Sequence, residues 1–297
     1  MTTPDPMDDF DTTPPDGDWA GYVAIDPDIS MWVERIGDSA HGRTPVLLLS
    51  EAEAPSHRWP EPLIDSLVAE LGSVIRFDTR DSGRSSWVEP LYGLDDLATD
   101  AVAVLDALGV DRAHVVGRSM GGMVAQIVAI VHPERVASLT LISTTPGPDE
   151  ALGPPEQWLV DHMAERLFAA EPTDPTERVE WLVEQQRWFA GPRFPFEEDR
   201  VMAAAVVEVS DFWRGKAGHG AAVVEAGSRM SQLGSVDVPT LVVHGTADPV
   251  HPVAHGQALA GAISGARLEL VDGLGHELPA AFAPRLVDLI ARLARGG

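Results

Sequence analysis

The sequence contains no cysteine and has only 21 lysine and arginine residues against 46 aspartate and glutamate residues. Without cysteine the chain can form neither a disulfide nor a thiolate metal site, and it has no cysteine nucleophile. Its formal net charge of -25 repels phosphate backbones and anionic headgroups, so we expect neither nucleic acids nor membrane surfaces as partners. Apolar runs are also short, well below the roughly 18 residues that a membrane-spanning helix needs.

The 297 residues are enough for one large domain with an insertion. The first 18 residues, MTTPDPMDDFDTTPPDGD, are acidic and rich in proline, and they lack the basic and apolar regions of a secretory signal. We therefore predict a disordered tail over residues 1–18 and a cytoplasmic location. The sequence gives no indication of the oligomeric state.

From residue 19 onward, short apolar runs alternate with helical patterns. After a predicted hairpin, the runs predicted as strands are PVLLLS (45–50), VIRFDTR (74–80), AHVVG (113–117), SLTLIST (138–144), TLVVHGT (240–246) and RLELVDG (267–273). Apolar strands that alternate with helices predict an α/β fold, in which a mostly parallel sheet carries helices on both faces.

One long interval interrupts this alternation. Residues 146–235 are rich in helix formers and are too many for a loop, so we predict a helical cap inserted into a core of residues 19–145 and 236–297. Aromatic residues gather in this interval. Some could line an apolar pocket, and we expect this of Trp158, Trp181 and Trp188; the alternative is that they pack the core of the cap itself.

The run AHVVGRSMGG places Ser119 between Gly117 and Gly121, in the pattern G-x-S-x-G, where a strand is expected to meet a helix. A sharp turn there lifts the serine hydroxyl above the carboxyl edge of the sheet as a candidate nucleophile. The N–H of Met120 would then lie at a helix start, where a developing oxyanion is stabilised. The alternative is a serine that merely caps the helix.

A serine nucleophile needs a base, and the base needs an acid that orients it. His276 follows one predicted strand in VDGLGHELP, and Asp248 follows another in VVHGTADPV. The order serine, aspartate, histidine is typical of side chains on the carboxyl-end loops of such a sheet. The alternatives are a surface histidine and an aspartate that starts a turn.

On these motifs, and on FDTRDSGRS (77–85), the chain resembles the α/β-hydrolase family over residues 20–295. The runs DAVAVLDALGVDRAHVVGRSMGG, VPTLVVHGTADPV and GLGHELP resemble most the methylesterases that trim anthracycline-type polyketides in actinomycetes. The resemblance implies a sheet of the eight-stranded type. It also implies Ser119 as nucleophile, His276 as general base and acid, and Asp248 as the residue that orients the histidine.

One loop departs from the family pattern. Where the family usually has glycines that supply a second oxyanion N–H, this chain reads SEAEAPSHRW without glycine, so Ala52 is the replacement by position. Glu51 and Glu53 either point into solvent or have a role in substrate binding, because a carboxylate aimed at an oxyanion would oppose the reaction. Arg118 is a candidate partner for such a glutamate, or for a substrate carboxylate or phenolate.

The sequence therefore predicts a serine hydrolase that acts on an ester or lactone of a bulky, largely apolar small molecule. No cofactor is expected, and His251 and His255 lack a third ligand at a suitable spacing for a metal. The altered loop leaves a non-hydrolytic enzyme of the same fold open, with decarboxylation, C–C cleavage or rearrangement as its reaction. A non-catalytic ligand-binding protein is the other alternative.

Overall fold

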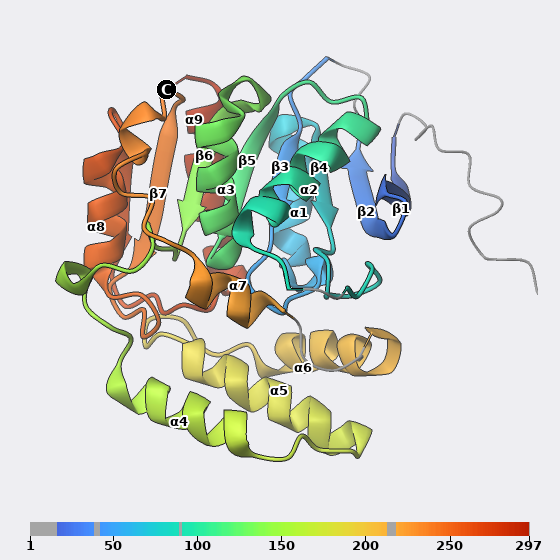
Figure 1. Ribbon diagram of the computed structural model, residues 1–297, viewed down its shortest axis with the longest axis vertical. Coiled ribbons are helices and arrows are strands. Elements are labelled where there is room, and N and C mark those ends of the chain that lie inside the picture. Colours follow the sequence, from blue (N-terminus) through green and yellow to red (C-terminus); the bar gives the residue numbers. More distant parts are fainter. Residues whose placement is uncertain (1–16, 39–41, 89–90, 213–217, 297) are drawn as a thin grey trace, which may run out of the picture.

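The computed structural model describes residues 17–38, 42–88, 91–212 and 218–296. Most of the tail predicted over residues 1–18 lies outside these ranges, as does Trp213 of the inserted interval. In the described part of the chain, a single central sheet is covered by helices on two faces, and a group of helices lies at one end of it (Figure 1).

The sheet has eight strands in the order β1-β2-β4-β3-β5-β6-β7-β8. The first two strands form a hairpin, and β2 pairs antiparallel with β4, whereas the strands from β4 to β8 are parallel to one another. The predicted α/β fold with a mostly parallel sheet is thus confirmed. The strands are β1 (Trp19–Asp26), β2 (Ile29–Gly37), β3 (Val46–Leu49), β4 (Ser73–Phe77), β5 (Ala113–Arg118), β6 (Val136–Ile142), β7 (Thr240–Gly245) and β8 (Arg267–Val271).

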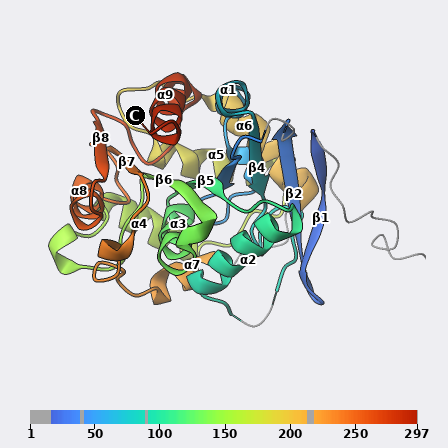
Figure 2. The same ribbon diagram turned by 90° about the horizontal axis from the view of Figure 1, so that it is seen from above.

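Side chains that alternate along the central strands build two apolar cores. Leu47 and Val115 point into the core formed with one set of helices, whereas Leu48 and Val116 point into the core on the opposite face. Figure 2 shows the two helical layers, and no helix among the described residues is long and apolar enough to cross a bilayer. The first layer contains α2 (Leu94–Ala107), α3 (Met120–Val131) and α8 (Val253–Ala262), and the second contains α1 (Glu61–Leu71) and α9 (Ala283–Ala294).

The described residues between β6 and β7 contain four α-helices, and we call them the helical insert: α4 (Gln157–Phe168), α5 (Pro175–Phe189), α6 (Glu198–Val207) and α7 (His219–Glu225). Helices α4, α5 and α6 lie below the sheet in the view of Figure 1. A small apolar core joins α5 to α6, with Leu182 and Val201 among its members. The short helices of the described chain are Ser56–Arg58, Pro133–Arg135, Glu150–Leu152, Leu233–Ser235, Ala280–Phe282 and the π-helix Glu208–Phe212.

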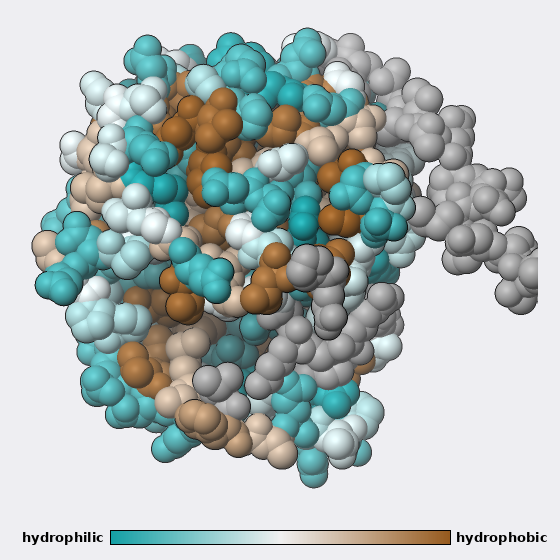
Figure 3. Space-filling view, viewed as in Figure 1, coloured by the Kyte–Doolittle hydropathy of each residue, from teal (hydrophilic) through white to brown (hydrophobic). Residues whose placement is uncertain are grey.

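Polar contacts attach the insert to the sheet domain. The guanidinium of Arg58 donates to Glu208 at the end of α6, with Nε 2.9 Å from Oε2. Glu197 accepts hydrogen bonds from the backbone N–H groups of Ala280 and Ala281, at 2.9 and 3.1 Å. The face of the molecule shown in Figure 3 is mostly hydrophilic with scattered apolar residues, as the strongly acidic composition leads one to expect.

Candidate active site

The turn between β5 and α3 explains why glycines surround Ser119. The serine has φ 52° and ψ -119°, a strained conformation for a residue with a side chain. A Cβ on Gly117 would lie 2.2 Å from the carbonyl oxygen of Gly121, and a Cβ on Gly121 would lie 2.1 Å from that of Leu49. The two glycines therefore permit the close backbone approach that raises Ser119 at the carboxyl end of β5.

Ser119, His276 and Asp248 lie together. The hydroxyl Oγ of Ser119 is 3.0 Å from Nε2 of His276, and Nδ1 of the same ring is 2.9 Å from Oδ2 of Asp248. Because the carboxylate can only accept, Nδ1 carries the proton, and Nε2 is left to accept from the serine hydroxyl. The three residues follow β5, β7 and β8, whose carboxyl ends meet at one edge of the sheet.

Asp248 is held in its charged form. Its Oδ1 also accepts from the N–H groups of Val250 and His251, at 2.9 and 3.0 Å. Burial by itself favours the neutral acid, but the nearby His276 and the hydrogen bond from it outweigh burial, so the pKa of the Asp248 carboxyl lies well below its ordinary value. An ionised Asp248 fixes the His276 tautomer and stabilises the imidazolium that a proton transfer from serine would create.

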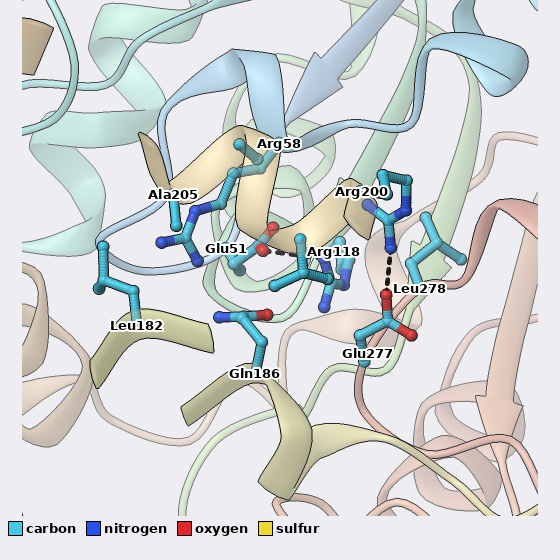
Figure 4. A pocket seen from close by; sticks show the side chains of 11 residues that line it. Glu51, Arg58, Arg118, Leu182, Gln186, Arg200, Ala205, Glu277 and Leu278 are labelled. Atoms are coloured by element: carbon cyan, nitrogen blue, oxygen red, sulfur yellow. Dashed lines mark hydrogen bonds and ion pairs between the residues drawn. The ribbon is translucent and has the colours of Figure 1, made fainter. Parts of the chain in front are cut away.

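Arg118, which directly precedes Ser119, forms an ion pair with Glu51, and Figure 4 shows this pair. Nη1 of Arg118 donates to Oε1 of Glu51 over 2.8 Å, and Nη2 donates to the backbone carbonyl of His276 over 3.0 Å. Burial raises the pKa of Glu51, but the positive charges of Arg118 and Arg58 outweigh burial and lower it. Glu51 is therefore an ionised and compensated carboxylate, which does not fit the alternative of a solvated loop residue.

The loop after β3 turns tightly without a glycine. The N–H of Ala54 donates to the carbonyl of Glu51, and Glu53 adopts φ 61°. The side chain of Ala52 joins the apolar cluster that contains Met120. No described residue accepts a hydrogen bond from the N–H of Ala52, and the N–H of Met120 is the first of α3, so it has no carbonyl partner within the helix. Both N–H groups are thus available for a ligand.

A pocket adjoins the serine, since two of its lining residues, Arg118 and Glu277, are sequence neighbours of Ser119 and His276. Its cavity volume for a water-sized sphere is about 20 Å³, which is room for roughly one water molecule. Figure 4 shows its lining from the sheet domain and from the insert. The lining residues are Glu51, Arg58, Arg118, Glu277 and Leu278 from the sheet domain, and Leu182, Gln186, Arg200, Val201, Ala204 and Ala205 from the insert.

Several residues expected at the substrate lie elsewhere. Glu53 and the three tryptophans are absent from the pocket lining among the described residues. Trp158 is 44% exposed, the indole N–H of Trp188 donates to Glu184, and the guanidinium of Arg166 stacks 3.3 Å above the ring of Trp181. Trp158 and Trp188 both meet the ring of His162, so the three tryptophans contact other side chains of the insert, but none of them belongs to the apolar core between α5 and α6.

Other residues at the site had no recognisable signal in the sequence. Arg58 and Glu208 are 150 positions apart in the chain, so no local pattern could pair them. Gln186 and Arg200 lie on insert helices whose orientation toward the serine depends on tertiary packing. Glu277 could have been identified from the sequence as a residue of the site, because it directly follows His276. A buried charge next to a candidate base changes the electrostatics of the site.

Residues 45–279 match the model of the alpha/beta hydrolase fold family, and the chain belongs to this family. It is 32% identical to the rhodomycin D methylesterase DnrP of Streptomyces peucetius, over 90% of this chain and 96% of the relative. It is also 27% identical to 3-oxoadipate enol-lactonase 1 of Acinetobacter baylyi, over 77% of this chain and 80% of the relative. The resemblance to α/β hydrolases and to methylesterases of actinomycetes is thereby confirmed.

Among solved structures, an esterase from Rhodococcus superposes with a TM-score of 0.74 at 26% identity, and the match covers 92% of this chain and 99% of the esterase. Methylesterase, enol-lactonase and esterase are all names of carboxylic ester hydrolases. The similarity therefore supports the prediction that this chain is an enzyme of that class.

Proposed function

We propose that the protein is a serine hydrolase that cleaves a carboxylic ester or lactone through Ser119, His276 and Asp248. The observation that carries the proposal is the 3.0 Å separation between Nε2 of His276 and Oγ of Ser119, in a ring whose other nitrogen is held by Asp248. This is the geometry in which a general base can take the proton of a hydroxyl nucleophile.

In the first half of the reaction, Oγ of Ser119 attacks the substrate carbonyl while its proton moves to Nε2 of His276. The carbonyl oxygen becomes an oxyanion, which accepts hydrogen bonds from the N–H groups of Met120 and Ala52. The tetrahedral intermediate then collapses, the bond to the leaving oxygen breaks, and His276 returns the proton to that oxygen. Water, deprotonated by the same histidine, releases the acyl group from the serine in the second half.

The pocket favours an uncharged substrate with an apolar part. Each of its three guanidinium groups already has a carboxylate partner: Arg58 with Glu208, Arg118 with Glu51, and Arg200 with Glu277. Among the described residues of the lining, no cation is left over for a substrate carboxylate, and the rest of the wall is aliphatic apart from the amide of Gln186. An acidic ester would have to give up its hydration for a site that is already neutralised. The similarity to a methylesterase supports an ester as the substrate.

In this proposal residues 146–235 act as a cap over a core of residues 19–145 and 236–297. The cavity of about 20 Å³ is too small for an ester of any bulk, so substrate entry requires the insert to move away from the sheet domain.

The sequence left a non-hydrolytic reaction open because two carboxylates, Glu51 and Glu53, lie in the loop expected to supply an oxyanion donor. The ion pair with Arg118 neutralises the charge of Glu51, which weakens this argument.

The proposal is tested by reacting the purified protein with a fluorophosphonate probe, beside the variants Ser119→Ala, His276→Ala and His132→Ala. His132 lies at the end of α3, outside the triad and the pocket lining, and serves as the control for loss of a histidine. We expect stoichiometric labelling of the parent and of H132A, and none of the other two. A folded parent that resists the probe would contradict an activated serine.

A further inference from the structure

His219 joins the insert to the loop after β3. It begins α7, and its side chain is completely buried between Tyr92, whose ring it meets edge-on at 6.1 Å, and the chain after β4. Its Nδ1 lies 2.7 Å from the backbone nitrogen of Glu53. Its Nε2 lies 2.7 Å from the carbonyl oxygen of Arg80 and 3.3 Å from Oγ1 of Thr79. No sequence motif points to this residue.

The two backbone contacts determine which nitrogen of the ring carries the proton. The Glu53 nitrogen can only donate, so Nδ1 must accept, and the Arg80 carbonyl can only accept, so Nε2 must donate. His219 is therefore a neutral ring with its proton on Nε2. Burial lowers the pKa of His219, which favours this neutral form. The ring holds the loop after β3 and the loop after β4 at the same time.

The contact falls at the one residue of the loop that adopts an unfavourable backbone conformation. Glu53 has φ 61°, which glycine adopts freely and which costs energy in a residue with a side chain. The sequence SEAEA offers no glycine there. The hydrogen bond that His219 accepts from the Glu53 N–H stabilises this conformation. The bonded N–H follows that of Ala52 by one residue, so the bond restricts the segment that carries the Ala52 N–H.

We propose that His219 is a positioning residue, which compensates for the missing glycine by fixing the loop so that the N–H of Ala52 can stabilise the oxyanion. The inference rests on the proposed function, since it assigns His219 a role in that reaction. His219 touches neither Ser119 nor His276 and transfers no proton. Its effect is therefore on the rate of the chemical step, and binding of the ester in the ground state should change little.

Two amides separate the two contacts of the ring. In His219→Asn the side-chain oxygen can take the position of Nδ1 and still accept from Glu53, whereas the contact to Arg80 is lost. In His219→Gln the side-chain nitrogen can reach the position of Nε2, whereas the acceptor for Glu53 is lost. With p-nitrophenyl butyrate as the probe, we expect H219Q to lower kcat about 10- to 100-fold with KM within about threefold, because one oxyanion donor is misplaced.

H219N should recover most of that loss and reach a kcat within about fivefold of the parent. The second expectation is rescue: Glu53→Gly removes the backbone strain, so E53G/H219Q should equal E53G in kcat. A purely structural role predicts instead that H219N and H219Q lose activity and melting temperature alike, and that E53G rescues neither. Equal losses in H219N and H219Q, or a failure of E53G to rescue H219Q, would overturn the inference. An H219Q enzyme with the kcat of the parent would also overturn it.

The comparison remains decisive if H219Q does not fold. In that case E53G/H219Q is compared with E53G alone, and a tenfold lower kcat in the double variant overturns the inference. Labelling by the fluorophosphonate probe separates this from a failure of the proposed function. A parent that is not labelled and hydrolyses no ester contradicts both, whereas an active, labelled parent whose kcat is indifferent to H219Q contradicts only the role of His219.

Discussion

A single guanidinium connects the nucleophile turn to the two loops beside it: Nη1 of Arg118 lies 2.8 Å from Oε1 of Glu51, and Nη2 lies 3.0 Å from the carbonyl oxygen of His276. Arg118 directly precedes Ser119, so its side chain connects the loops that carry Ala52 and His276, the proposed oxyanion donor and the proposed base. The planar fork of arginine makes both bonds at once, which a lysine ammonium on a flexible stem does not reproduce.

The first prediction concerns this pair. Arg118→Met should destabilise the fold by about 3–5 kcal/mol, because it removes the guanidinium that hydrogen-bonds to the buried charge of Glu51. Glu51→Gln should cost less, and the double variant should be more stable than R118M alone, since it removes the uncompensated charge. Urea unfolding of the four proteins gives the coupling energy. Strictly additive effects would mean that the pair does not interact.

The sequence was sufficient to predict the fold and to bring Ser119, Asp248 and His276 to one edge of the sheet. Ser119 and Asp248 follow strands with a strong apolar pattern, and His276 follows the shorter, alternating strand β8. Parallel strands place such positions side by side. The environment of the triad was not predictable in the same way. The partner of Arg58 lies 150 positions away, and only the packing of α6 on the sheet domain brings Glu208 to it.

The loop after β3 shows a different limit. Its missing glycine was visible in the sequence, but the consequence was not, because the left-handed φ of Glu53 is supported by His219 from a helix 166 positions further on. The prediction that tryptophans of the insert line the pocket had a third weakness. An aromatic residue in a helix can face its neighbours or a pocket, and the sequence pattern did not distinguish these orientations.

The second prediction tests the close approach at the nucleophile turn. Gly121→Ala places a Cβ 2.1 Å from the carbonyl oxygen of Leu49, so one of two backbone segments must shift, at a cost of about 1–3 kcal/mol or more. Gly261→Ala is the matched control, because this exposed glycine near the end of α8 has nothing within 4 Å of an added Cβ. It should stabilise by about 0.5–1 kcal/mol. Equal free energies of unfolding for both variants would contradict the crowding.

The third prediction is a loss of stability as the pH falls from 7.5 to 5.5. Burial lowers the pKa of several histidines below the ordinary 6.5, so in this range the unfolded chain binds protons that the native protein does not, and unfolding becomes easier. Each such histidine contributes up to about 1.4 kcal/mol per pH unit. The histidines concerned are His57, His114, His219, His244, His251 and His255.

Urea unfolding at several pH values measures this dependence, and His114→Gln should reduce its slope by up to one proton. His114 suits the test because it lies on β5, where its Nδ1 is 2.9 Å from Oγ of Ser138, away from the serine and the pocket. A free energy of unfolding that is constant over this pH range would mean that the buried rings are protonated in the native protein as readily as in the unfolded chain.

The last prediction concerns the charge of the substrate. Every guanidinium that lines the pocket in the described part of the chain is paired. Dimethyl adipate should therefore be hydrolysed with a kcat/KM at least about tenfold higher than monomethyl adipate, whose free carboxylate must be desolvated without an unpaired cation to receive it. Gln186→Arg adds an unpaired guanidinium to the lining. It should lower the ratio of kcat/KM for the diester to kcat/KM for the monoester, chiefly by raising kcat/KM for the monoester. Gln185→Arg adds the same charge next to the pocket lining and should leave the ratio as it is. A parent enzyme that hydrolyses both esters equally well, or a ratio that responds equally to both arginines, would show that the paired charges do not select the substrate.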